Sequence, residues 1–140
     1  MTLAETNHSP PKDTFTPTSG VRYKTALEML ALSVSPTHLV TLNTHRVSTL
    51  EHAVGLLKRW RVETLRRLSG RDFFERPKED LFEYVAFPEL DSSRHPHFHL
   101  LVCVPSSMQI RFQLVAMERW KALAPSGTSR LRVIEQTADS

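Results

Sequence analysis

Residues 94–105 read RHPHFHLLVCVP, and this stretch carries both a strand pattern and a candidate site. Its apolar run, residues 97–104, is short and lies between two prolines, which indicates a β-strand. Alternate side chains of a strand point to the same face, so we expect His97 and His99 to project side by side. The stretch therefore predicts a strand that presents two imidazoles on one face.

Three further segments have strand patterns. They are residues 37–44 (THLVTLNT), residues 81–87 (LFEYVAF) and residues 131–137 (LRVIEQT). The connection between the second and third strands, residues 88–96, is short enough for an antiparallel hairpin.

A long helix is expected after the first strand. Ser48, with Glu51 three positions later, forms a capping-box pattern, and an apolar stripe then runs to a stop at Gly70. The side chains that this stripe is expected to bury are Leu50, Val54, Leu57, Trp60, Leu65 and Leu68.

A second long helix is expected after the third strand. Pro105 and Ser106 begin it, Gln109 is the reciprocal capping residue, and Pro125 with Gly127 end it. The side chains expected on its buried side are Ile110, Leu114, Met117 and Trp120.

The order of elements predicts the fold class. Strand, helix, strand, strand, helix, strand is the order of a ferredoxin-like split βαβ fold. We therefore expect an α+β domain in which both helices pack on one antiparallel sheet.

Length and composition are those of one globular domain. The 140 residues are 40% hydrophobic, and the single cysteine, Cys103, excludes a disulfide framework and fits a reducing cytosol. We expect residues 1–32 to be a flexible arm with a short helix at 21–32, and residues 33–140 to form the domain. No apolar stretch approaches membrane-span length and the first residues are polar, so we expect a cytoplasmic protein without a membrane partner.

The histidine pair suggests a metal site. Two imidazoles at positions i and i+2 of a strand can reach one divalent ion, and Glu89, at the exit of the neighbouring strand, is a candidate third ligand. Such a set leaves open positions on the ion, as Mg²⁺, Mn²⁺ or Zn²⁺ catalysis requires. The opposing interpretation is that a His-x-His pair on a strand often arises by chance.

The motifs around this pair resemble a known family. His97-Phe98-His99, running into an apolar strand, resembles the signature of the HUH endonucleases, which include rolling-circle replication initiators of plasmids and phages, transposases and relaxases. Residues 40–44 (VTLNT) are similar to the family's first motif, and Glu89 lies where initiators commonly carry an acidic residue. The resemblance covers about residues 37–137.

This resemblance implies a specific chemistry. Mg²⁺ or Mn²⁺ held by Glu89, His97 and His99 would polarise a phosphodiester of single-stranded or hairpin DNA, with Thr41 and Asn43 helping to line the site. A tyrosine from a Tyr-x-x-x-Lys motif after the fourth strand would attack the phosphorus and remain joined to the 5′ phosphate.

The expected tyrosine motif does not follow the fourth strand, because no tyrosine comes after Tyr84. Three explanations stay open: the chain ends before the nucleophile helix; the protein keeps the fold as a non-cleaving DNA-binding or partner-binding regulator of a mobile element; or Tyr23 acts from the N-terminal side, as in the permuted relaxases. We expect Tyr84 to pack in the sheet.

A basic cluster offers a second line of argument. The cluster lies on or just after the first helix, and its candidate nucleic-acid-binding residues are Lys58, Arg59, Arg66, Arg67 and Arg71. The alternative interpretation is that these residues form an ordinary solvent-exposed helix face. Trp60, which lies among them, fits the apolar stripe of the helix better than it fits a role in stacking on bases. The net charge of +3 permits a nucleic-acid partner without requiring one.

The remaining histidines suggest no second site. His95 extends the pair to His-x-His-x-His, which superficially resembles the nucleotide-binding histidine triad, but Pro96 and the lack of a glycine-rich approach do not fit that family. We expect His95 in a loop and His38, His45 and His52 at the surface or at strand ends.

Overall fold

The computed structural model describes residues 35–47 and 49–134, so the predicted arm at residues 1–32 lies outside the described residues. The main elements are β1 (His38–Asn43), α3 (Leu50–Ser69), β2 (Glu83–Leu90), β3 (Pro96–Cys103), α4 (Gln109–Leu123) and β4 (Thr128–Val133). Three short 3-10 turns, Phe73–Glu75, Lys78–Asp80 and Ser106–Met108, lie in the connections.

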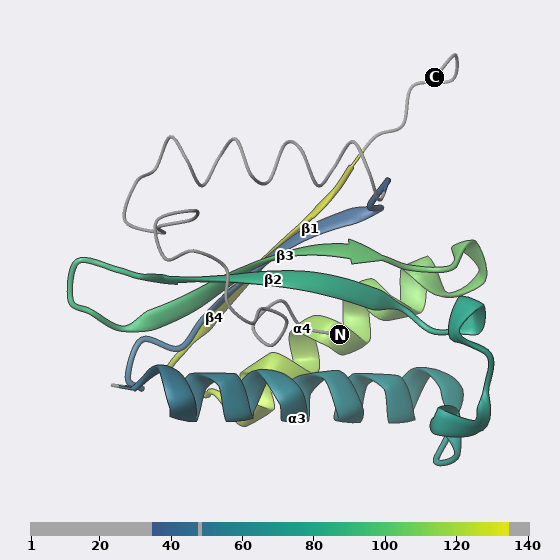
Figure 1. Ribbon diagram of the computed structural model, residues 1–140, viewed down its shortest axis with the longest axis horizontal. Coiled ribbons are helices and arrows are strands. Elements are labelled where there is room, and N and C mark those ends of the chain that lie inside the picture. Colours follow the sequence, from purple (N-terminus) through teal and green to yellow (C-terminus); the bar gives the residue numbers. More distant parts are fainter. Residues whose placement is uncertain (1–34, 48, 135–140) are drawn as a thin grey trace, which may run out of the picture.

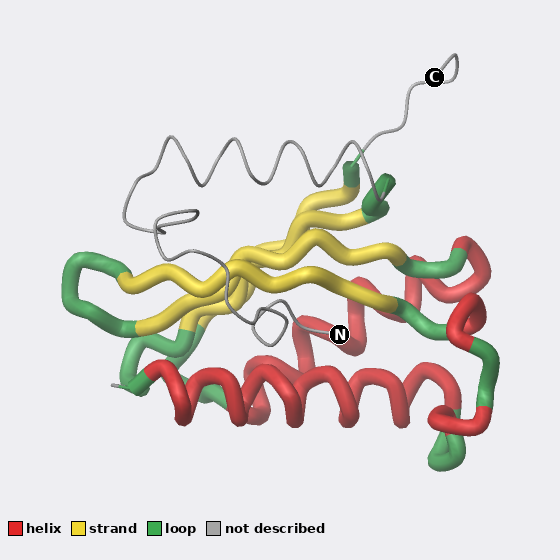
Figure 2. The backbone as a smooth tube through the Cα atoms, in the orientation of Figure 1, coloured by secondary structure: helices red, strands yellow, loops and turns green. Residues whose placement is uncertain are grey.

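The four strands form one sheet in the order β2-β3-β1-β4, and all neighbouring strands are antiparallel. Helices α3 and α4 lie on the same side of this sheet and pack against each other (Figure 1, Figure 2). The predicted α+β class, with an antiparallel sheet and two helices packed on it, is confirmed.

The core lies between the sheet and the two helices. Side chains at alternate positions of β1 and β3 face the helices, and those of Val40, Leu42, Phe98, Leu100 and Val102 are fully buried there. The indole N–H groups of both tryptophans donate to backbone carbonyls: Trp60 Nε1 to Ala116 (2.9 Å) and Trp120 Nε1 to Asn43 (3.1 Å). Trp60 is therefore a core residue, as predicted, and is not available to stack on a base.

The edge strands differ most from their predicted bounds. Strand β2 runs past Phe87 to Leu90 and includes Pro88, which lacks the N–H of a ladder bond. The proline is tolerated because β2 is an edge strand of the described sheet. Strand β4 begins at Thr128, three residues before the predicted start, because its polar residues 128–130 pair with β1. The last predicted residues of that strand, 135–137, lie outside the described residues.

Helix α3 begins one residue later than predicted. Its N-cap is Thr49, whose Oγ1 accepts the N–H of His52 (3.1 Å), so the assignment of the cap to Ser48 is wrong. Leu50, expected to be buried, is exposed in the first turn. The predicted stop at Gly70 is confirmed, with a positive φ of 94° and an N–H that donates to Arg66 O.

The buried side of helix α4 agrees with the prediction only in part, at Trp120. Ile110 and Leu114 are 77% and 70% exposed, whereas Phe112, Ala116 and Trp120 are buried. Both sets have helical spacing, so periodicity alone does not choose between them. The two aromatic rings remove more apolar area from water than the aliphatic pair, and they set the rotation of the helix.

His38 is the first residue of β1, which agrees with its expected place at a strand end, but its side chain is fully buried and does not lie at the surface. Gln113 Nε2 donates to His38 Nε2 (3.1 Å), so the imidazole is protonated on Nδ1, which donates to Thr37 Oγ1 (2.7 Å). Burial lowers the pKa of His38 below its ordinary value of 6.5. The side chain therefore acts as a neutral, hydrogen-bonded part of the core.

This environment predicts a loss of stability in mild acid. Because burial lowers the pKa values of both His38 and His99 in the folded protein, the unfolded chain takes up protons first as the pH falls below 6.5. The free energy of unfolding in metal-free buffer should be highest above pH 6.5 and should fall as the pH drops through the lowered pKa values. Urea unfolding from about pH 8 to pH 5 measures this. His52→Gln, which removes an exposed histidine, should keep the same decline, and a flat profile in the wild type would contradict the prediction.

Candidate metal centre

Three side chains converge on one point of the sheet. Glu89 Oε1 lies 3.1 Å from His97 Nε2 and 2.9 Å from His99 Nε2. The three potential ligand atoms all lie within 4.8 Å of one another. The structure thus brings together the three residues that the sequence predicted as ligands.

Strand register produces this convergence. Glu89 of β2 is directly opposite His97 of β3, and His99 lies two residues further on the same face of β3. Their neighbours Phe98 and Leu100 point into the helix-facing core, so the three candidate ligands point to the other face of the sheet.

The hairpin turn at residues 91–95 holds that register. Asp91 Oδ1 accepts the N–H groups of Ser93 and His95, each at 2.8 Å, and Arg94 has a positive φ of 66°. The hydrogen bond from the His95 backbone N–H is the largest effect that lowers the pKa of Asp91. The carboxyl group therefore stays ionised and continues to accept both hydrogen bonds. His95 itself lies in the loop, as expected.

The environment favours the ligand form of His99. The side chains of His97, His99 and Glu89 are 14%, 24% and 30% exposed. Burial lowers the pKa of His99, while the hydrogen bond to Glu89 opposes this effect. The net effect keeps the His99 imidazole neutral at physiological pH, and a metal ligand must be neutral imidazole.

Thr41 and Asn43 lie on the same face as the three ligands. Thr41 Oγ1 is 3.4 Å from His99 Nδ1, so it can orient that ring while Nε2 is directed at Glu89. Asn43 is opposite His97 in the register, but its Oδ1 accepts the N–H of His45 (2.9 Å) and closes a turn. Of these two predicted lining residues, only Thr41 contacts a candidate ligand among the described side chains.

The donor set fits a divalent cation. Two imidazole nitrogens and one carboxylate oxygen leave coordination positions for outside ligands, as in catalytic metal sites. His97 Nδ1 is buried and has no hydrogen-bond partner among the described residues. The imidazole is therefore held by packing and by Nε2, the atom directed at Glu89.

The predicted basic cluster lies on the other side of the molecule. Lys58, Arg59, Arg66 and Arg67 are exposed on α3, which covers the face opposite the three ligands, and Arg71 follows that helix (Figure 1). Arg59 pairs with Glu63 at 3.2 Å, and Arg67 pairs with Glu118 at 3.5 Å. A phosphodiester held at the ligand group would not contact these residues.

Sequence reasoning missed two arginines that share the face of the ligands. Arg130 of β4 is opposite Thr41, and Thr41 is opposite His99. Arg132 is opposite Leu39, and both arginines are exposed. Their Arg-x-Arg spacing was visible in the sequence, but their relation to the histidines depends on pairing across β1.

The described tyrosine is not placed to act at the ligand group. Tyr84 points into the helix-facing core, and burial raises its pKa to about 12. Tyr23, the other candidate nucleophile, lies outside the described residues.

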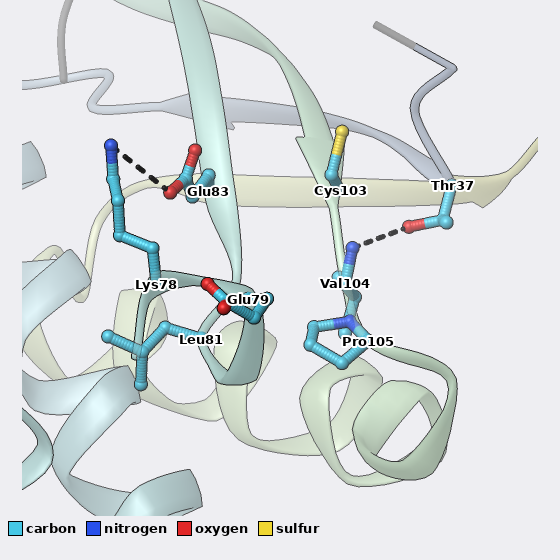
Figure 3. Close-up of a pocket in the computed structure, with 8 residues that line it drawn as sticks. All are labelled: Thr37, Lys78, Glu79, Leu81, Glu83, Cys103, Val104 and Pro105. Carbon is cyan, nitrogen blue, oxygen red and sulfur yellow. Dashed lines mark hydrogen bonds and ion pairs between the residues drawn. The ribbon is translucent and has the colours of Figure 1, made fainter. Parts of the chain in front are cut away.

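A cavity of about 440 Å³ lies at the opposite end of β2 and β3 (Figure 3). Cys103 and Glu83 are paired across the two strands there, and Lys78 approaches Glu83 at 3.8 Å. Burial, with a smaller effect of Glu83, raises the pKa of the Cys103 thiol. The six-residue offset from Glu83 to Glu89 corresponds to about 20 Å along a strand, so Cys103 does not belong to the candidate metal centre.

Comparison with protein families, with curated proteins and with solved structures finds no match to this chain. In the part of the chain that the structure describes, no helix has both the length and the apolar character needed to cross a bilayer.

Proposed function

We propose that this protein binds one divalent cation, Mg²⁺ or Mn²⁺, through Glu89, His97 and His99 and uses it to engage single-stranded or hairpin DNA in the manner of HUH-type replication initiators. The observation that carries the proposal is the convergence of the three ligand atoms within 4.8 Å of one another on one face of the sheet. The His-Phe-His order and the first-motif-like residues 40–44 on the adjacent strand support the same assignment.

The chemistry of the donor set supports a phosphate ligand. A carboxylate and two neutral imidazoles leave the bound cation with net positive charge and open positions, which phosphate oxygens can fill. A bound cation would polarise a phosphodiester there. Glu89, held between both imidazoles, would fix the ligand geometry, and Thr41 would orient His99.

The strand order supports a finer description of the fold. Strand β3 lies between β1 and β2, and β1 lies between β3 and β4. We assign this arrangement to the ferredoxin-like split βαβ class, which places the His-x-His strand in the middle of the sheet.

Cleavage of the DNA strand would require a nucleophile in addition to the metal centre. Nicking requires a tyrosine nucleophile, and Tyr84 is excluded by its burial in the core. Tyr23 or a tyrosine supplied by another segment would have to act. The alternative function is a non-cleaving DNA-binding or partner-binding regulator of a mobile element, and the burial of Tyr84 favours it. A role for the α3 cluster in binding DNA stays a prediction.

The test is binding and cleavage of a labelled DNA hairpin with a single-stranded flank. The wild type should bind with salt-sensitive affinity, and Mn²⁺ should strengthen binding relative to EDTA. His97→Asn should lose the Mn²⁺ effect. Absence of binding under both conditions would contradict a DNA function.

The same reactions separate the two functions. A shortened DNA product joined covalently to the protein, and its loss in Tyr23→Phe, would show a nicking enzyme that uses Tyr23. Metal-dependent binding without any product would favour the regulator.

A further inference from the structure

We propose that Arg130 and Arg132 of β4 are phosphate-binding residues that hold a single DNA strand along the β4 side of the sheet, next to the metal centre. This inference rests on the proposed function and deepens it, because it names the surface that receives the strand on either side of the cation. It is carried by strand register, exposure and charge.

Register places the arginines beside the ligand group. Arg130, Thr41 and His99 form one row across β4, β1 and β3. Two strand spacings separate Arg130 from His99, or about 10 Å between their backbones, and the long arginine side chain shortens this gap. Arg132 lies two residues further along the same face, about 7 Å from Arg130. An extended strand can present successive phosphates to the cation and to these two guanidinium groups.

No described acid lies beside the two arginines on their own side of the sheet. Both are exposed, and neither forms an ion pair with a described residue. The described acids of this face, Glu83 and Glu89, both lie on β2, which is the opposite edge of the sheet. Three strand spacings, about 14 Å, separate them from β4. Among the described residues the β4 edge is therefore positive, and a cation at Glu89 would extend positive charge toward β2.

The same face offers little for base recognition. Phe87 is the aromatic residue, other than the two histidines, that the described strands place there, and it is 3% exposed. Stacking on bases is thus limited among the described residues, and contacts to the phosphate backbone dominate. We expect binding that depends strongly on salt and weakly on base sequence.

The experiment compares two double variants that remove equal charge. Arg130→Gln with Arg132→Gln changes the proposed surface. Arg76→Gln with Lys121→Gln changes two exposed cations in the helix layer, one after the turn Phe73–Glu75 and one on α4. The probe is a short fluorescent single-stranded oligonucleotide, titrated in Mn²⁺ and in EDTA at several salt concentrations.

At low salt the β4 variant should bind the oligonucleotide about tenfold more weakly, because it loses two phosphate contacts and the counterion release that accompanies them. Its plot of log affinity against log salt should be shallower by about 1.4, since each single-strand contact contributes about 0.7. The helix-layer variant should match the wild type. The β4 variant should keep its thermal stabilisation by Mn²⁺, which shows an intact fold and metal site.

Other outcomes separate this inference from the proposed function. If the wild type binds and the β4 variant binds equally well, the arginine assignment is overturned while the DNA function stands. If the wild type responds to Mn²⁺ and ignores the oligonucleotide, both the DNA function and this inference fail while the metal site stands. Displacement by polyglutamate as effective as by unlabelled DNA at equal charge would show a general polyanion surface and would overturn the assignment to DNA.

Discussion

His97→Ala is expected to abolish the stabilisation of the protein by Mn²⁺. A ligand that binds only the folded state at one hundred times its dissociation constant stabilises that state by about 2.7 kcal/mol. For a domain near one hundred residues this corresponds to a rise in melting temperature of roughly 10 °C or more. Removing one imidazole leaves a two-ligand set that does not hold the ion at that concentration.

The measurement is the difference between melting temperatures with Mn²⁺ and with EDTA, which removes any effect of the substitution on basal stability. Glu83→Gln is the matched control, because Glu83 lies on the same strand and face as Glu89 and is remote from His97. It should keep the full Mn²⁺ shift, whereas Glu89→Gln should lose most of it. A wild type that shows no shift would remove the metal site, and with it the proposed function.

Gly127→Ala is expected to destabilise the fold by about 3 kcal/mol, the upper range for forcing extra atoms into a packed site. An ideal β-carbon at Gly127 would overlap the carbonyl oxygen of Asn43 and would also touch Ala124. That carbonyl already accepts the indole N–H of Trp120, so the end of β1 is fixed by α4 and cannot move away without breaking this partly buried hydrogen bond.

Gly55→Ala is the control for this substitution. Gly55 lies within α3, and its added β-carbon would meet no atom within 4 Å. Alanine there should stabilise the protein by about 1 kcal/mol through helix propensity. Urea unfolding of both variants therefore should give changes of opposite sign. Equal changes would show that the Gly127 backbone can relax and that β1 is not held as described.

The three candidate ligands could be predicted from the sequence because their relative positions depend on residues that are close together in the chain. The side-by-side placement of His97 and His99 requires only strand alternation, and Glu89 requires only a hairpin. The position of the β4 arginines relative to His99 depends on the pairing of β1 with both β3 and β4, and no local sequence pattern encodes that long-range pairing. Their place beside His99 therefore became visible only in the structure.

The errors elsewhere have a common physical origin. In α4, Trp120 is buried as predicted, but Phe112 is buried with it in place of Ile110 and Leu114, because both groups have helical spacing and the larger buried area decided between them. His38 was expected at the surface or at a strand end, and its burial depends on a hydrogen bond to Thr37 and on one from Gln113, which is distant in sequence. Local patterns indicate which residues are apolar, and tertiary partners decide which of them are buried.

Pro88 and the β4 arginines also have a consequence for self-association. An unprotected sheet edge can template the addition of a strand from another molecule, which leads to aggregation. Here one edge carries a proline that cannot donate a ladder bond, and the other carries two like charges that would repel the same strand of a second copy. Both edges therefore disfavour growth of the sheet from one molecule to the next, even at high protein concentration.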